Sequence, residues 1–138
     1  MIPVLVFDIE TIPDVSGIRA LTGVGADCSD AEVAAQAFSA RREKTGSDFL
    51  QHHLHRVAAI SCVFRDNEGF RVRSLGSLED TEEKLVHDFF KVVDRYTPQL
   101  VSWNGGGFDL PVLNYRALIH GVTASRYWEQ GEIGRAHV

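Results

Sequence analysis

Two carboxylates stand two positions apart near the start of the chain, in the segment Phe7-Asp8-Ile9-Glu10-Thr11. The apolar residues before them indicate a strand, and alternate residues of a strand point to the same face. Asp8 and Glu10 should therefore share a face, with their Cα atoms roughly 6–7 Å apart. Carboxylates this close repel each other, and a hard cation such as Mg²⁺ or Mn²⁺ removes the repulsion. Taken alone, the pair fits metal binding and fits equally a strand that becomes polar as it leaves the core.

A second group of interest is the loop Asn104-Gly105-Gly106-Gly107-Phe108-Asp109. Three successive glycines let a backbone approach a ligand closely. Their spacing matches neither the dinucleotide-binding fingerprint nor the phosphate-binding loop, which disfavours a nucleotide-binding domain. Taken alone, Asp109 fits the N-cap of a following helix, and Phe108 fits ordinary core packing.

The elements that must position these groups follow from apolar spacing, capping residues and turns. We expect strands over residues 3–11, 57–64, 70–75 and 99–103, and helices over about 29–44, 81–96 and 109–120. The first two strands are apolar without alternation, which predicts that both of their faces are covered. Trp103 is expected in the core, and Cys62 is expected to be an inert buried thiol. Residues 13–27 should form a loop, and the first helix lies in a long insertion.

Taken together, the two acidic motifs resemble those of the 3′–5′ exonucleases of the DEDD group. The similarity is greatest to the proofreading exonuclease domain of family B DNA polymerases and its free-standing bacterial relatives. It rests on Phe7-Asp8-Ile9-Glu10-Thr11, followed by Asn104-x-x-x-Phe108-Asp109, with an antiparallel hairpin and a helix between them. The resemblance implies an α/β fold of the ribonuclease H-like type, a mixed sheet flanked by helices, over residues 1–131.

The resemblance also implies roles for individual residues. Asp8, Glu10 and Asp109 would ligate two divalent ions, Mg²⁺ or Mn²⁺, and metal-activated water would cleave the terminal phosphodiester by in-line attack. Thr11 would meet the terminal nucleotide, Asn104 would lie near the penultimate one, and Phe108 would pack beside the strand end. The implied partner is a single-stranded 3′ end, for which we favour DNA over RNA.

The third motif of that group, Y-x-x-x-D or H-x-x-x-x-D, does not occur after Asp109. Tyr127 is followed by Gly131 at the position an aspartate would need, and His120 is followed by Ser125. We therefore expect a partial domain that ends before its last strand and helix, with weak or no activity. Residues 132–138 equal the translation of a widely used sequencing adapter, which predicts a non-native tail. The alternative is a non-catalytic module on the same fold that binds nucleic acid or protein.

The composition sets wider limits on function. Hydrophobic residues make up 44% of the chain and charged residues 24%, which is ordinary globular usage and excludes a disordered or disulfide-stapled chain. The net charge of -5 argues against a generally basic surface that coats nucleic acid, but it does not exclude a nuclease. Two smaller clusters are interpreted as a loop and a solvated helix end rather than as ligand sites. They are His52, His53 and His55, and Arg41, Arg42 and Lys44 with Arg56.

The cellular setting follows from what the sequence lacks. No apolar run approaches the roughly 20 residues of a membrane-spanning helix, and no basic leader precedes the first strand. Cys28 and Cys62 form no C-x-x-C pair. We therefore expect a cytoplasmic protein with no membrane partner.

Overall fold

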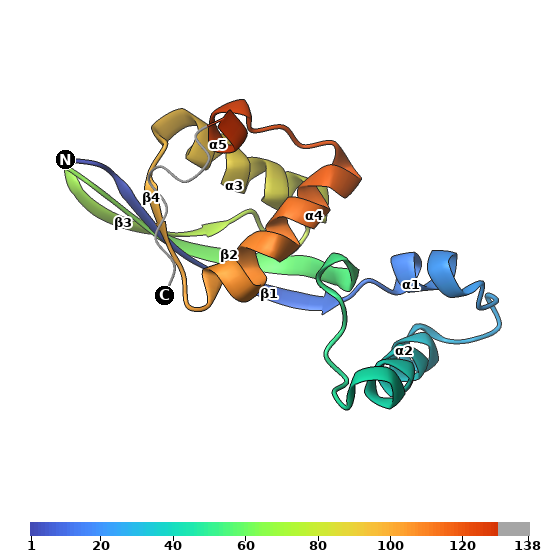
Figure 1. The fold of residues 1–138 in the computed structure, drawn as a ribbon. Coiled ribbons are helices and arrows are strands. Elements are labelled where there is room, and N and C mark those ends of the chain that lie inside the picture. Colours follow the sequence, from blue (N-terminus) through green and yellow to red (C-terminus); the bar gives the residue numbers. More distant parts are fainter. Residues whose placement is uncertain (130–138) are drawn as a thin grey trace. The chain divides into compact units, whose positions relative to one another are not determined.

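The computed structural model describes residues 1–129. Its internal packing divides the chain into two compact units (Figure 1). The larger unit combines Met1–Thr11 with the chain from Val57 onward, and the smaller unit is Ile12–Arg56. Residues 132–138, for which a non-native tail is predicted, lie outside the described part.

The larger unit is built on a four-stranded sheet in the order β3-β2-β1-β4. Its strands are β1 (Val4–Pro13), β2 (His55–Asp66), β3 (Gly69–Leu75) and β4 (Gln99–Val101). β1 and β4 are parallel, with Val4 opposite Gln99 and Val6 opposite Val101. β2 and β3 form the predicted antiparallel hairpin, which closes where Asp66 meets Gly69. The sheet is therefore mixed, as the sequence predicts.

Three helices of this unit are described: α3 (Glu82–Tyr96), α4 (Leu110–His120) and α5 (Ser125–Glu129). The Thr81 side chain caps α3 by accepting the Lys84 N–H, and the helix ends at Thr97, which has a left-handed φ of 42°. Pro98 follows and cannot continue a helix. α3 and α4 therefore agree with prediction, whereas the short α5 was not expected.

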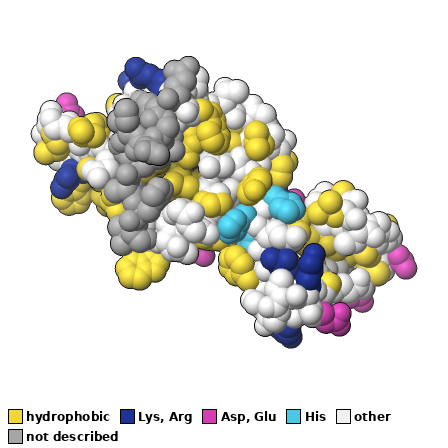
Figure 2. Space-filling model, viewed as in Figure 1, with side chains coloured by type: hydrophobic (Ala, Val, Ile, Leu, Met, Phe, Trp, Pro, Cys, Tyr) yellow, Lys and Arg dark blue, Asp and Glu magenta, His cyan; other side chains and the backbone are white. Residues whose placement is uncertain are grey.

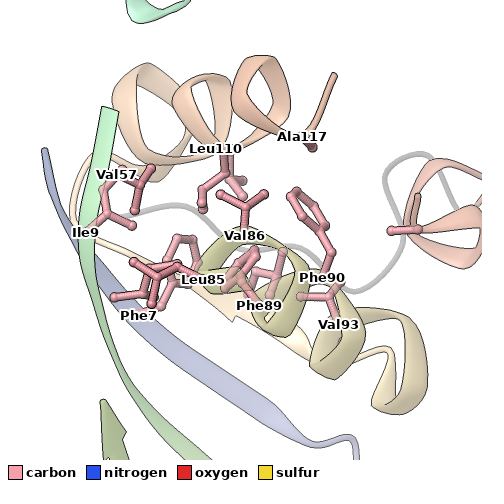
Figure 3. Close-up of a cluster of buried hydrophobic side chains, with 14 of the residues drawn as sticks. Phe7, Ile9, Val57, Leu85, Val86, Phe89, Phe90, Val93, Leu110 and Ala117 are labelled. Carbon is pink, nitrogen blue, oxygen red and sulfur yellow. The ribbon is translucent and has the colours of Figure 1, made fainter. Parts of the chain in front are cut away.

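The core lies between the sheet and these helices (Figure 3). Leu5, Phe7 and Ile9 point from β1 toward the helices and are almost fully buried. The Phe7 and Phe89 rings lie 5.0 Å apart between centroids, within the range in which aromatic pairs attract. Alternate residues of β1 therefore anchor the strand, and the residues between them point to the opposite face.

That opposite face corrects the expectation of strands covered on both sides. Val6 is 41% exposed, and Asp8 and Glu10 are exposed. β2 alternates in the same way, with Ile60 and Cys62 buried and Ser61 exposed between them. The reason is that α3 and α4 pack on one face of the sheet, so an unbroken apolar run does not require two covered faces.

The smaller unit consists of α1 (Val15–Thr22), α2 (Asp30–Thr45) and a 3₁₀ turn, η1 (His52–Leu54). The prediction of a loop over 13–27 is wrong, because α1 lies within it. Asp14 caps α1 by accepting the Gly17 N–H, and Ile18 is buried in a small apolar cluster with Val33, Leu50 and Leu54. Packing thus stabilises a helix too short to be stable alone.

α2 was predicted from a capping box, and both of its hydrogen bonds are present. Ser29 accepts the Glu32 N–H at 3.2 Å, and Glu32 accepts the Ser29 N–H at 2.9 Å.

Among residues 1–129, no helix is both long and apolar enough to cross a membrane.

Candidate active site

The structure brings the carboxylate of Asp109 beside β1. Asp109 is 3% exposed, and its Oδ2 accepts a hydrogen bond of 2.8 Å from the Ser102 hydroxyl. The carboxylate also accepts the backbone N–H of Ile9, and it lies close enough to Asp8 to experience that residue's charge. The two acidic motifs, far apart in the sequence, therefore meet at one place.

The electrostatics of this place are unfavourable for a negative charge. Burial raises the pKa of the Asp109 carboxyl, the Ser102 hydrogen bond opposes that rise, and the negative charge of Asp8 raises the pKa further. No Lys, Arg or His side chain within residues 1–129 forms an ion pair with Asp109. Burying the Asp109 carboxylate next to the carboxylate of Asp8 therefore costs folding free energy.

The parallel pairing of β1 and β4 produces this meeting. β4 ends at Val101, opposite Val6, while β1 continues past it through Asp8 to Pro13. The chain leaving β4 therefore turns alongside the second half of β1. The carboxyl ends of parallel strands are where open α/β sheets place their sites.

The glycine loop supplies the turn. Asn104 has a left-handed φ of 53°, and its carbonyl accepts the N–H groups of Gly107 and Phe108 at 3.1 and 3.0 Å. Gly105–Asp109 then forms one turn of π-helix, η2, which continues directly into α4. A Cβ on Gly107 would collide with the Asn104 carboxamide, so any other residue there would displace the Asn104 side chain. The loop is specialised to fold the chain tightly before Asp109.

The other predicted site residues lie around this pair. Glu10 is exposed on the same face of β1 as Asp8, and Thr11 is half-buried at the end of the larger unit's first segment. Asn104 is exposed, and Phe108 is half-buried against the core. Within residues 1–129, no three His, Cys, Asp or Glu side chains are gathered closely enough to hold a metal ion, so Glu10 does not join Asp8 and Asp109 here.

Two structural predictions for this segment, a helix cap at Asp109 and a core position for Trp103, are wrong. Asp109 does not cap α4: its side chain makes no cap hydrogen bond, and its backbone is already helical. Trp103 is not in the core, because it is 83% exposed. Leu100 and Ser102 point to the buried side at the end of β4, and Trp103, the next residue, points to solvent.

The structure also places the remaining candidates. Tyr127 is buried against Phe90 and donates its hydroxyl to Asn114, 3.2 Å away, and His120 contacts Glu82. Neither is next to the carboxylate pair. Cys62 is buried, which raises the pKa of its thiol, as expected of an inert cysteine.

The histidine and basic clusters lie in the smaller unit, where several of their side chains have protein partners. His52 and His53 belong to η1, and His55 Nε2 lies 3.1 Å from the Leu50 carbonyl. Arg41 donates to the Phe49 carbonyl, and Arg42 pairs with Asp48 at 2.9 Å.

Sequence reasoning missed Ser102 as a site residue. Its signal was weak, because a serine at a strand end is common. The parallel register that puts it beside Asp109 exists only in the folded sheet.

Residues 47–137 match the model of a family described as a predicted 3′–5′ exonuclease related to the exonuclease domain of PolB. The chain belongs to this exonuclease-related family. The matched region includes Asn104, Phe108 and Asp109, and it begins after Asp8 and Glu10.

The fold is also similar to a solved structure, a family B DNA polymerase from the hyperthermophilic archaeon Pyrobaculum calidifontis. The TM-score is 0.53 at 18% identity, over 100% of this chain and 15% of the polymerase. The mixed sheet flanked by helices is thus the ribonuclease H-like fold of a polymerase exonuclease, and the chain spans a small fraction of that polymerase. No curated protein matches the chain.

Proposed function

We propose that this domain hydrolyses the terminal phosphodiester at a single-stranded 3′ end, with DNA favoured over RNA, by divalent-metal catalysis. The observation that carries the proposal is the buried Asp109 carboxylate beside Asp8, which pairs with no cationic side chain among residues 1–129. Membership of an exonuclease-related family supports a nucleic acid as the partner.

The donor set suits a hard divalent cation, because Mg²⁺ and Mn²⁺ prefer carboxylate oxygen ligands. Asp8 and Asp109 would hold the ion together, with Glu10 joining from the same face of β1 and a second ion sharing these ligands. Bound there, the metal would supply positive charge that activates the attacking water and stabilises the leaving oxygen.

The chain's own groups would orient this site. The Ser102 hydroxyl and the Ile9 N–H fix the Asp109 carboxylate, so that its position does not depend on solvent. Thr11, Asn104 and Phe108 would contact the last nucleotides, as positions that flank the two acidic motifs.

The free thiols of Cys28 and Cys62 support our proposal that the protein works in the cytoplasm.

The fourth carboxylate expected of such a site is not supplied by residues 110–138 in either recognised form. We therefore infer that the chain as printed trims strands weakly or not at all. A version that carries the third motif after α4 should trim strongly, because a fourth ligand and a water-orienting Tyr or His complete the site.

The test is trimming of a 5′-labelled single-stranded oligonucleotide, with Mg²⁺, Mn²⁺ or EDTA, read as shortening from the 3′ end. Both versions are compared with their Asp8→Ala and Asp109→Asn variants, and Asp88→Asn, a half-buried acid on α3 that pairs with Lys84, is the matched control. Metal-dependent trimming that Asp109→Asn abolishes and Asp88→Asn does not supports the proposal. Parallel RNA and DNA substrates decide the sugar preference.

A second candidate function, a non-catalytic binding module, also has support. Among residues 1–129, no three metal-ligating side chains lie together. Binding of the oligonucleotide without trimming by either version would identify a non-catalytic binding module. Turnover by the printed chain equal to that of the longer version would refute our account of the third motif.

A further inference from the structure

Trp103 is the most conspicuous side chain that the proposed site does not use. Tryptophan is highly buried on average, yet this one is 83% exposed. It directly precedes Asn104 and directly follows Ser102, the residue that holds Asp109. An exposed indole beside a candidate active site therefore needs an explanation.

The end of the β1–β4 ladder brings Trp103 to the region of Asp8. Val101, the last residue of β4, pairs with Val6, and Trp103 follows two residues later in the turn, as Asp8 follows Val6 along β1. Burial alternates from Leu100 through Trp103, which puts Trp103 on the face of Val101. Asp8 is exposed on the face of β1 that also carries Val6, the partner of Val101.

The backbone around Trp103 is fixed on both sides. Ser102 is 3% exposed and bonded to Asp109, while the Asn104 carbonyl accepts two N–H groups of the glycine loop. The indole is therefore presented to solvent from a rigid support. A preorganised aromatic ring loses little entropy when it binds a flat partner.

The charge of the chain favours a source of affinity other than phosphate contacts. Lys and Arg number 14 against 19 Asp and Glu, and on the face in Figure 2 the basic side chains form small separate groups. The negative net charge argues against a generally basic surface that would hold the phosphates. Stacking of bases on aromatic rings supplies affinity without net positive charge, and it requires unpaired bases.

We propose that Trp103 stacks on a base of the strand whose 3′ end lies at Asp8 and Asp109, and that it thereby selects unpaired ends. This inference rests on the proposed function, and it names the residue that recognises single-stranded character. Trp103 is a specificity-determining residue, with no part in the hydrolysis itself.

The experiment uses the indole as its own reporter. The chain has two tryptophans, and the other, Trp128, contacts Tyr127 with ring centroids 4.8 Å apart. Trp128→Phe leaves Trp103 as the sole tryptophan. A short oligothymidine with phosphorothioate terminal linkages, added with Mg²⁺, should quench its fluorescence. An abasic oligonucleotide of equal length and charge should not.

Binding affinity, measured by anisotropy of the labelled oligothymidine, completes the test. Trp103→Ala should weaken binding about 5- to 150-fold, the usual range for one stacked base, while Trp103→Phe keeps most of the affinity. Leu78→Ala, at another fully exposed apolar side chain, should leave the affinity unchanged.

Equal affinity of Trp103→Ala and wild type, or equal quenching by the abasic strand, would overturn the inference and leave the proposed function standing. Base-dependent quenching without any metal-dependent trimming by the longer version would overturn the proposed function alone.

Discussion

Two buried carboxylates of the larger unit, Glu82 and Asp109, have opposite surroundings. Arg116 donates to both oxygens of Glu82, from Nε at 2.9 and 3.0 Å and from Nη2 at 2.6 Å. His120 Nε2 lies 2.6 Å from the same carboxylate, and the Val57 N–H donates at 2.6 Å. Asp109 has a hydroxyl, a backbone N–H and the negative charge of Asp8.

The difference separates a structural acid from a candidate functional one. A buried charge is tolerated when it is paired and hydrogen-bonded, and Glu82 satisfies this rule by joining α3, α4 and β2. Asp109 has hydrogen bonds but no cationic partner among residues 1–129, so the rule is only half satisfied. We assign the missing part to a divalent cation.

Breaking the structural cluster should have the largest effect. Glu82→Gln removes the charge that compensates the buried Arg116, and breaking such a pair costs about 3–5 kcal/mol of unfolding free energy. Urea unfolding measures this cost. Glu83→Gln, at the next and exposed position of α3, should change the stability by less than about 0.5 kcal/mol. Equal effects of the two variants would contradict the role given to Glu82.

Adding Mg²⁺ should have the next largest effect, and it should act through the other carboxylate. Saturating the site at about 10 to 100 times its dissociation constant stabilises the wild type by about 1.4 to 2.7 kcal/mol. Thermal unfolding should show the gain in wild type and Asp88→Asn, and its loss in Asp8→Asn and Asp109→Asn. A gain that survives in Asp109→Asn would place the ion elsewhere.

Removing the Asp109 charge should be harmless or stabilising when no metal is added, in contrast to Glu82→Gln. Because the folded pKa of Asp109 is raised, its stabilising contribution is present below the unfolded pKa of about 3.9 and is lost as pH rises through the folded value. The stability of Asp109→Asn relative to wild type should therefore increase as the pH rises from the unfolded pKa of Asp109 through its folded pKa. Urea unfolding over a pH series with EDTA measures the gap, and a wild type more stable than the variant at neutral pH would refute this.

The smallest effects are opposite shifts in the pKa of Asp109, measured by NMR titration of its carboxyl carbon. Asp8→Asn removes a like charge and should lower that pKa, whereas Ser102→Ala removes a hydrogen bond to the charged form and should raise it. Shifts of the same sign would mean that one of these neighbours is misassigned.

Local signals were enough to predict much of the fold. The acidic residues at its start, the spacing of Leu85, Phe89 and Val93, and Pro98 mark α3 within a residue or so of its ends. The period of two in β1 placed Asp8 and Glu10 on one face. The α1 helix was missed because it is short, contains Gly17, and depends on the packing of Ile18.

The meeting of the two acidic motifs was expected only by resemblance. Its physical cause is the parallel β1–β4 register, a long-range pairing that no local pattern encodes. The error over Trp103 has the same origin. An aromatic residue at a strand end is usually buried, and only the arrangement of helices on one face shows that it points outward.

Titration of the ¹⁵N-labelled protein with substoichiometric Mn²⁺ tests the central contrast in one sample. Paramagnetic broadening should appear first at the amides of Ile9 and Asp109 and should decrease along α4 with distance from Asp109. Broadening that begins around Glu82, or that spreads evenly over the other acids of α3, would contradict the assignment of Asp109 and Asp8 as the metal-binding pair.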